Sequence, residues 1–465
     1  MIPMVIGYNC ESSSNCVCSG PYQIPGVAPQ VAKKPNIVFI FSDQQNASMM
    51  SCAGTHYINT PAMDSIAKNG VLFSRAYCAN PACLPARFSL MTGRLPSEIG
   101  IRSNSSAVNE VPHAIKKNAL GSVFRDAGYR TAYGGHVHLP RMTVEDIGFT
   151  SLIDDDRNQL ADACIGYIDA AGDDPYLLVA SFINPHDICY MAIRDFASTE
   201  EEIRLVERGG VPFQHLDRAL LFPAGAELPP LPANFEPQAD EPEAISILQA
   251  RRPFKQKARA LYSPEQWRKH RWAYARLTEM VDAQVARVLA AVRRSNRRDD
   301  TIIVFSSDHG DMDASHRMEH KAALYDESCR VPFIISDPAG GLTEVTVGDY
   351  PVSVGLDLLP TLCDFADIAA PSDIQGVSLR SAVKGGEQNT REFIPVESEY
   401  GRMVVSDRYK YIRYDEGSQN EQLMDLVSDP GEMENCFKRA DKRDVLNQLK
   451  GYFSRQWDEE SGYVD

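Results

Sequence analysis

The chain has 465 residues, with 47 lysine and arginine residues against 63 aspartate and glutamate residues, a formal net charge of −16 and 43% hydrophobic residues. This composition allows a sizeable buried core. The acidic balance argues against a protein that binds nucleic acid, which needs a net basic face, but it leaves room for a local basic pocket that holds a small anion. No run of about 18 or more apolar residues is present, so no membrane span is predicted.

The first residues make a poor secretory signal, because they lack a basic start and their apolar stretch is only about six residues long. The stretch between Cys10 and Pro29 is rich in Ser, Pro and Gly. We therefore expect residues 1–34 to form a flexible leader. The expected location is the cytoplasm, or the periplasm or the exterior if the natural start differs.

Apolar runs recur along the chain from residue 36 onward, and most are followed directly by polar or glycine-rich residues. Such continuous runs are typical of strands that are buried on both faces of a parallel sheet. The runs are residues 37–41, 129–133, 176–183, 301–305 and 331–335. Between them, residues 272–292 carry Leu and Val at near-helical spacing. This alternation predicts a doubly wound, mostly parallel α/β sheet covered by helices on both faces.

Side chains suited to chemistry follow several of these runs. They are Asp43, His138, His186, Asp308 and His309. Because open α/β sheets bind ligands beyond the carboxyl ends of their strands, we expect these side chains to lie close together.

Two later regions depart from the alternation. Residues 190–265 are partly Pro-rich and acidic, and predict a long surface excursion near the site. Their basic positions Arg251, Arg252, Lys255 and Lys257 indicate either one wall of a carbohydrate cleft or a solvated basic stretch. Residues 403–406 and 409–414 predict an antiparallel hairpin. The predicted organisation is a leader (1–34), a catalytic α/β domain (35–378) and a smaller α+β subdomain with an antiparallel sheet (379–465).

The segment 80–94 has the most specific pattern in the chain. Pro85 suits the first turn of a helix and Gly93 suits its end, so we expect Cys83 at the helix N-terminus and Arg87 one turn further on. Exposed N–H groups and the helix dipole stabilise negative charge there, either on the cysteine or on an anionic substrate.

This segment resembles the signature of the type I sulfatases of the alkaline phosphatase superfamily. Their C-x-P-x-R motif followed by T-G is matched by Cys83, Pro85, Arg87, Thr92 and Gly93. The resemblance extends from about Pro35 into the C-terminal subdomain. It includes a first strand with a metal aspartate, two histidine segments, a second metal and sulfate-binding segment, and a C-terminal L-x-D-L-x-x-D-P-x-E motif. The first strand is residues 36–43, and the histidine segments are residues 135–139 and 184–186. The second metal and sulfate-binding segment is residues 307–328, and the C-terminal motif is residues 422–432.

The resemblance implies two cofactors. In this family a maturation enzyme oxidises the cysteine to Cα-formylglycine, so a formylglycine-generating enzyme is an expected partner and residue 83 the expected nucleophile. A divalent metal is implied beside it: Ca²⁺ suits the oxygen ligands, with Mn²⁺ or Mg²⁺ as alternatives. The implied metal ligands are Asp43, Gln44, Cys83, Asp308 and His309.

The resemblance also implies roles for the remaining residues. The implied catalytic residues are Cys83, Arg87, His138, His186 and Lys321. Substrate contacts are expected from His136, His316 and Lys321, whereas the spacing of His320 does not match the family. Lys321 or His186 would protonate the leaving alcohol, and His138 would act as the base.

The implied activity is hydrolysis of a sulfate monoester, on a sulfated carbohydrate or on a small ester such as choline sulfate. A phosphonate monoester or phosphodiester hydrolase with the same nucleophile is an alternative, because Ala86 in the signature and the Asp-Gln and Asp-His pairs resemble those enzymes. A further alternative is a catalytically silent protein that binds a sulfated glycan, which the intact Cys83 and its predicted partners argue against.

Overall fold

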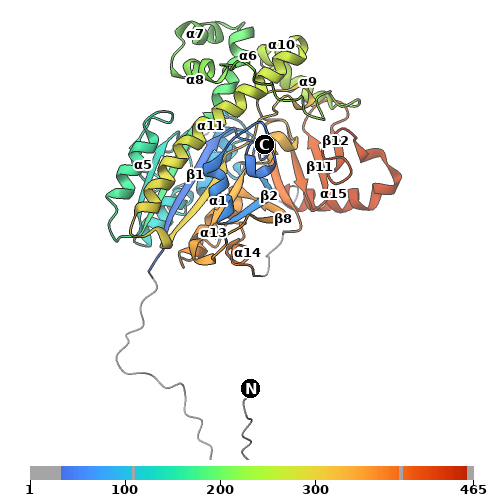
Figure 1. Cartoon of the computed structure of the whole chain (residues 1–465). Helices are drawn as coiled ribbons and strands as arrows, with labels where there is room; N and C mark the ends of the chain where they lie inside the picture. Colours follow the sequence, from blue (N-terminus) through green and yellow to red (C-terminus); the bar gives the residue numbers. More distant parts are fainter. Residues whose placement is uncertain (1–32, 107–109, 387–390, 458–465) are drawn as a thin grey trace, which may run out of the picture. The chain divides into compact units, whose positions relative to one another are not determined.

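The structure is a computed structural model that describes residues 33–106, 110–386 and 391–457. The described residues from Lys34 onward form one compact unit (Figure 1). Apart from Lys33 and Lys34, the predicted leader lies outside the described residues. Among the described residues, no helix is both long enough and apolar enough to cross a membrane.

An eight-stranded sheet forms the centre of this unit, in the order β4-β3-β5-β1-β6-β7-β2-β8. Every neighbouring pair is parallel except the two pairs that β7 makes. The predicted mostly parallel sheet is therefore confirmed, with one antiparallel strand inside it. The strands are β1 (Asn36–Asp43), β2 (Val71–Tyr77), β3 (Arg130–Gly135), β4 (Thr150–Ile153), β5 (Tyr176–Pro185), β6 (Thr301–Ser307), β7 (Phe333–Ser336) and β8 (Thr346–Ser353).

Strand β1 shows why the sheet is covered on both faces. Ile37, Phe39 and Phe41 pack in one apolar cluster with the first group of helices, and Val38 and Ile40 pack in a second cluster with the other group. Both sets of side chains are fully buried. The first group is α2 (Cys83–Thr92), α4 (Leu120–Asp126) and α13 (Val354–Phe365), and the second is α1 (Pro61–Lys68), α5 (Leu160–Asp169) and α11 (Pro264–Arg294). The helix predicted over residues 272–292 lies within α11.

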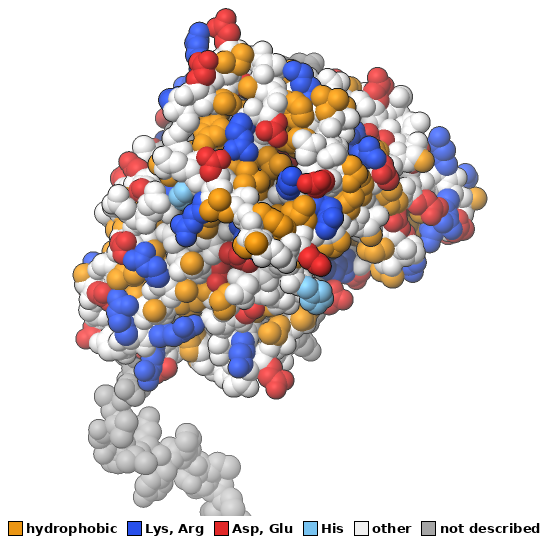
Figure 2. All heavy atoms as spheres, turned by 45° about the horizontal axis from the view of Figure 1, so that its top comes forward, with side chains coloured by type: hydrophobic (Ala, Val, Ile, Leu, Met, Phe, Trp, Pro, Cys, Tyr) orange, Lys and Arg blue, Asp and Glu red, His pale blue; other side chains and the backbone are white. Residues whose placement is uncertain are grey.

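Five helices lie within residues 190–265, apart from the first residue of α6, and they are at the top of Figure 1. They are α6 (Cys189–Phe196), α7 (Glu200–Arg208), α8 (Val211–Ala219), α9 (Glu243–Ala250) and α10 (Pro253–Leu261). Part of this segment packs against α11 in a third buried apolar cluster, where Leu216 and Phe254 lie with Trp267 of α11. Figure 2 shows this face, on which basic and acidic side chains lie among apolar ones.

A four-stranded antiparallel sheet follows, in the order β12-β11-β10-β9. Its strands are β9 (Ile394–Ser398), β10 (Gly401–Val405), β11 (Tyr409–Tyr414) and β12 (Glu421–Asp425). The predicted hairpin is β10–β11. Helix α15 (Arg443–Trp457) packs on this sheet, where Phe453 meets Tyr411 edge to face. The backbone N–H of Glu397 donates to the carbonyl oxygen of Ala79, which joins this sheet to the segment before Cys83. The remaining short helices are α3 (His113–Lys117), α12 (Asp326–Cys329) and α14 (Arg380–Val383).

Candidate active site

Cys83 is the first residue of α2, as the sequence predicted. Ala82 before it is extended, and Gly93 ends the helix in the left-handed conformation with a φ of 68°. The Cys83 residue is 2% exposed. Burial, and next the neighbouring Asp43, raise the pKa of the Cys83 thiol to about 12. An unmodified cysteine here is therefore an un-ionised thiol at neutral pH.

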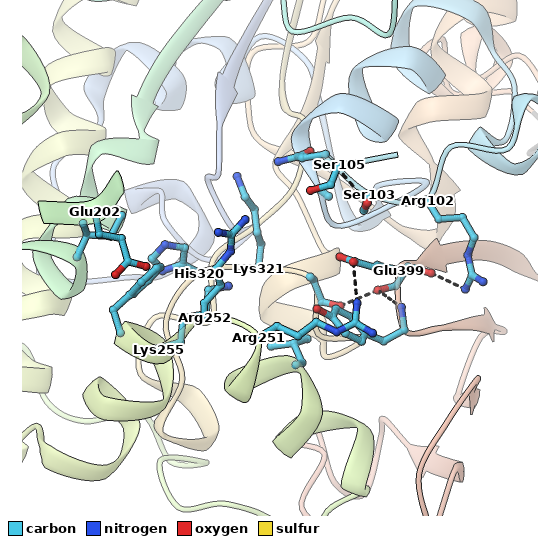
Figure 3. A pocket seen from close by; sticks show the side chains of 18 of the residues that line it. Arg102, Ser103, Ser105, Glu202, Arg251, Arg252, Lys255, His320, Lys321 and Glu399 are labelled. Carbon is cyan, nitrogen blue, oxygen red and sulfur yellow. Dashed lines mark hydrogen bonds and ion pairs between the residues drawn. The ribbon is translucent and has the colours of Figure 1, made fainter. Parts of the chain in front are cut away.

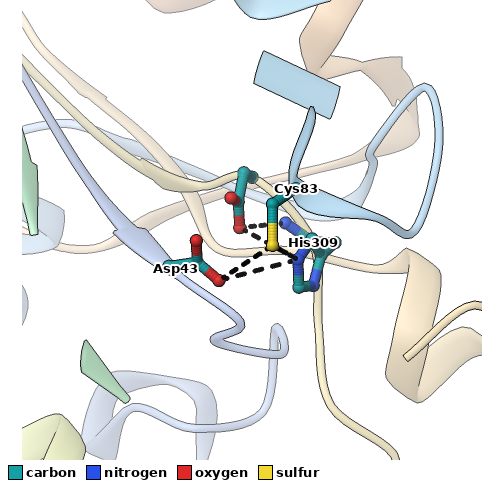
Figure 4. A group of neighbouring side chains, drawn as sticks. Asp43, Cys83 and His309 are labelled. Carbon is teal, nitrogen blue, oxygen red and sulfur yellow. Dashed lines mark hydrogen bonds and ion pairs between the residues drawn. The ribbon is translucent and has the colours of Figure 1, made fainter. Parts of the chain in front are cut away.

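Four buried side chains gather at this helix start, at the carboxyl ends of β1 and β6 (Figure 4). They are Asp43, Cys83, Asp308 and His309, and their potential ligand atoms all lie within 4.8 Å of one another. The Nε2 of His309 lies 3.3 Å from the Sγ of Cys83 and 3.6 Å from an oxygen of each aspartate. The structure thus brings together four of the five predicted metal ligands.

The chemistry of these donors fits a divalent cation. The Nδ1 of His309 lies 2.9 Å from the carbonyl oxygen of Gly310. Since that oxygen only accepts, Nδ1 holds the proton and Nε2 presents a lone pair to the two carboxylates. Burial holds the pKa of His309 well below its usual value, so the ring is neutral. Acceptor atoms that face one another in a buried site call for a cation among them, and carboxylates with an imidazole suit Ca²⁺ or Mn²⁺.

Arg87 lies beneath the two aspartates and is fully buried. Its Nε donates to Asp308 at 2.8 Å and its Nη2 to Asp43 at 2.9 Å. Its Nη1 donates to the carbonyl oxygen of His136 and to Ser181. A guanidinium has five N–H donors, so these four hydrogen bonds leave few donors for a substrate. In this structure, Arg87 orients the two carboxylates.

The pKa values of the two aspartates are shifted in opposite directions, because the charge of one disfavours the charge of the other. Burial raises the pKa of Asp43, but Lys321 and Arg87 outweigh it and hold this pKa well below its usual value. For Asp308, burial and the charge of Asp43 raise the pKa to about 7. Two nearby carboxylates in a dry site cannot both ionise freely without further positive charge, which again favours a bound cation.

Lys321 is a second cation beside the cluster. Its Nζ donates to the Sγ of Cys83 at 2.7 Å and lies 3.8 Å from Asp43. Burial disfavours its charge, but Cys83 and Asp43 outweigh this effect and raise the pKa of Lys321. Lys321 is therefore an ammonium at neutral pH.

Three further predicted site residues, His136, His138 and His186, lie near the same cluster. The Nε2 of His136 is 3.8 Å from Asp43, and its ring centroid is 5.6 Å from that of His138. Burial is the largest cause that lowers the pKa of His138 to about 4 and that of His186 to about 3. Both rings are therefore neutral at pH 7. Gly135 makes this strand end possible, because a Cβ there would lie 2.1 Å from the carbonyl oxygen of Ser181.

Gln44 and His316 are positioned differently from the other predicted residues. The side-chain amide of Gln44 donates to Asp311 at 2.7 Å and also contacts Cys189, while its backbone N–H donates to Asp308. His316 is buried and stacks on Tyr325, with ring centroids 4.0 Å apart. Its ring has no described contact with Cys83 and does not line the pocket described next. The roles given to these two residues remain predictions.

A pocket of 530 Å³ adjoins the cluster and shares Lys321 with it (Figure 3). Residues distant in sequence line it, from the segment after α2, from α7, α9 and α10, and from the β9–β10 turn. His320, which family spacing left outside the site, lines this pocket beside Lys321. Arg102 and Glu399 also line it and were not predicted. A motif search does not find them, because only the fold brings these loops together.

The doubly wound sheet and the buried cluster define a hydrolase with the fold of the alkaline phosphatase superfamily. A family model described as "Sulfatase" matches residues 35–368, and one described as "N-sulphoglucosamine sulphohydrolase, C-terminal" matches residues 314–458. The chain therefore belongs to the family of formylglycine-type sulfatases. It is a sulfatase.

Individual relatives agree with this assignment. A Delta 4,5-hexuronate-2-O-sulfatase of Bacteroides thetaiotaomicron is 32% identical over 470 residues, which cover 93% of this chain and 92% of the relative. The structure of a 2-O GAG sulfatase matches with a TM-score of 0.77 and 30% identity, over 93% of this chain and 95% of that one. A phosphonate monoester hydrolase of Agrobacterium radiobacter matches with a TM-score of 0.69 over 93% and 96% of the two chains, and its 21% identity shows a shared fold alone.

Proposed function

We propose that the protein hydrolyses a sulfate monoester on a carbohydrate, with a formylglycine made from Cys83 as its nucleophile. The observation that carries this proposal is the position of residue 83, which contacts the Lys321 ammonium and lies in one buried group with Asp43, Asp308 and His309. The relatives named as hexuronate and GAG sulfatases support a carbohydrate substrate.

Two groups would complete the site. Asp43, Asp308 and His309 would hold a divalent cation, Ca²⁺ or alternatively Mn²⁺ or Mg²⁺, with Gln44 and residue 83 as further ligands. Bound there, the cation would lower the pKa of a coordinated hydroxyl and polarise a sulfate oxygen. A formylglycine at position 83, supplied by a maturation enzyme, would provide the attacking hydroxyl in its hydrated form.

The other side chains of the site would orient the carboxylates, balance the sulfate charge and transfer protons. Arg87 holds both carboxylates in place through its paired hydrogen bonds. The Lys321 ammonium faces residue 83, where it would balance sulfate charge and give a proton to the leaving alcohol. Neutral His138 would accept a proton, and His136 and His186 would line the sulfate position.

The mass of one tryptic peptide tests the nucleophile. Cleavage after Arg75 and Arg87 releases residues 76–87, which contain both Cys78 and Cys83. After reduction and alkylation, an unconverted peptide takes two alkyl groups, whereas a converted one takes a single group, on Cys78. Cys78 is thus an internal control. The Cys83→Ala variant should have no sulfatase activity, and a variant that keeps most of the activity would refute the proposed nucleophile.

Phosphonate monoester or phosphodiester hydrolysis is the second candidate. Ala86 in the signature and the fold shared with a phosphonate monoester hydrolase favour it. The two activities are distinguished by kcat/KM measured on an aryl sulfate and an aryl phosphonate with the same enzyme preparation. A higher value on the phosphonate would reverse our assignment, and hydrolysis of neither would favour the silent glycan-binding alternative.

A further inference from the structure

The pocket beside Lys321 has more positive charge than its own acidic groups neutralise. Five cationic side chains line it, and so do three carboxylates. The cationic residues are Arg102, Arg251, Arg252, Lys255 and Lys321, and the acidic residues are Glu201, Glu202 and Glu399. The partners of each cation show where the excess lies.

Two of the five cations are already paired inside the protein. Arg251 forms ion pairs with Glu399 at 2.9 Å and with Glu416 at 3.0 Å. Arg102 lies 2.7 Å from Asp415 and also donates to backbone carbonyl oxygens. Lys321 donates to Cys83 and lies beside Asp43, so Arg252 and Lys255 remain.

Within the described part of the chain, neither Arg252 nor Lys255 has a carboxylate oxygen within the 4.0 Å of an ion pair. The nearby Glu202 is engaged elsewhere, because its carboxylate accepts the backbone N–H groups of Ser198 and Thr199 at the start of α7. Lys255 is nevertheless only 9% exposed. Burial lowers the pKa of Lys255 to about 8, although Cys189 and Asp311 favour its charge, so an anion placed beside the ammonium would stabilise it.

The position of this pair on α10 adds to the positive potential. Arg252 is the N-cap residue of the helix, Lys255 lies in its first turn, and both side chains line the pocket. No acidic residue lies in that turn. Cations are unfavourable at the positive end of a helix dipole, and an anion there is favourable. Figure 3 shows both residues on the same side of the pocket as His320 and Lys321.

We propose that Arg252 and Lys255 form a second anion site, which holds a carboxylate or a second sulfate group of the substrate while the sulfate to be cleaved lies against Lys321. This inference rests on the proposed function for the position of the first sulfate. It narrows the substrate class to saccharides that carry at least two anionic groups. A sulfated uronic acid provides the carboxylate, and a disulfated sugar provides the second sulfate.

The test measures binding, so that it does not depend on turnover. The full-length Cys83→Ala protein, loaded with Ca²⁺, is titrated by calorimetry with a sulfated uronic acid and with its methyl ester, which lacks the second charge. A disulfated hexosamine and its monosulfated counterpart form the second pair of probes. We expect one charged probe to bind at least about tenfold more tightly than its partner, and that pair identifies the group recognised.

Variants assign the preference to these residues. Lys255→Gln and Arg252→Gln, each added to Cys83→Ala, should reduce the preference to within about threefold. The matched control is Lys257→Gln, which removes one positive charge from an exposed position on the same helix and should keep the preference. If the Lys255→Gln variant is unstable because Lys255 is buried, the variant of the exposed Arg252 still tests whether the binding preference is lost.

Two outcomes would overturn the inference: equal affinity for both members of each probe pair, or a preference that survives the double variant Arg252→Gln with Lys255→Gln. Hydrolysis by the unmutated enzyme is measured separately. A protein that shows the binding preference and hydrolyses no sulfate ester would refute the proposed function and leave the second anion site supported.

Discussion

The ammonium of Lys321 lies 2.7 Å from the Sγ of Cys83, although 238 positions separate the two residues in the chain. Cys83 comes from the start of α2, and Lys321 from the loop that follows β6. The contact places a permanent positive charge against the proposed nucleophile in a buried site, where such a charge acts most strongly.

Replacing Lys321 by Ala should therefore lower kcat by about 100- to 1,000-fold, the usual effect of removing one preorganised charge from a reaction site. The measurement is steady-state hydrolysis of an aryl sulfate, with conversion of residue 83 checked by mass spectrometry in each preparation. Lys269→Ala, at a half-exposed position on α11, is the control and should have the parental kcat. A Lys321→Ala enzyme within tenfold of the parent would show that this charge does not stabilise the transition state.

Removal of divalent metal should abolish activity and lower the melting temperature. Asp43, Asp308 and His309 then face one another with only Arg87 and Lys321 to balance the charge. Added Ca²⁺ at about 100 times its Kd should restore about 2.7 kcal/mol of stability, since it binds only the folded state. Parallel titrations with Mn²⁺ and Mg²⁺ rank the three ions by recovered activity.

The Asp308→Asn variant is the matched control for the metal, and its melting temperature should not respond to any of the three ions. Full activity after exhaustive chelation would contradict a catalytic metal.

We expect His316 to stabilise the folded protein and not to contact the substrate. Its buried ring stacks on Tyr325, and its backbone N–H donates to the carbonyl oxygen of Asn234. His316→Ala should therefore cost about 2–4 kcal/mol in the free energy of unfolding, as large-to-small core substitutions do, and leave KM within about threefold. Denaturant unfolding and steady-state kinetics measure the two effects. A normal stability with a KM raised more than tenfold would instead support the substrate contact that family resemblance implies.

Asp425 should make stability depend on pH. The hydrogen bonds from Arg408 at 2.8 and 2.7 Å, helped by Lys442, hold the pKa of Asp425 well below its usual value of 3.8. Its charged form thus stabilises the folded state above that value, and the contribution is lost as the pH falls toward the lower, folded-state pKa. Asp425→Asn should cost about 2 kcal/mol at pH 7, and the difference from the parent should shrink below about pH 4.

Denaturant unfolding between pH 3 and pH 8 would reveal this convergence. Asp407, in the turn between β10 and β11, is the control because its side chain is 86% exposed. Asp407→Asn should change stability by less than about 1 kcal/mol at every pH. A constant difference between Asp425→Asn and the parent across this range would show that the carboxylate charge is not the source of the stabilisation.

The central strands could be predicted from the sequence because they are buried on both faces. Each of the strands β1, β3, β5 and β6 was predicted from a short run of residues that polar site residues follow directly. Strands β4 and β8 were missed, since they lie at the two edges of the sheet and are partly exposed. Strand β2 was also missed, and its burial is interrupted at two positions. The direction of β7 depends on its partners β6 and β2, which a local pattern does not contain.

The sequence by itself placed Asp43 and Asp308 at the ends of apolar strands and Cys83 at the start of the helix that Gly93 ends, because strand ends and helix ends have local signals. The family resemblance then joined Cys83 to the strand-end residues. Spacing along the chain could not decide which residues of the loop after Asp308 face the pocket. Asp311 accepts the backbone N–H of His320, while the carbonyl of the distant Asn234 accepts that of His316. Only these tertiary contacts bring His320 to the pocket and His316 to Tyr325. The same holds for Arg252 and Lys255, since the positive charge of a pocket depends on which carboxylates the fold has placed elsewhere.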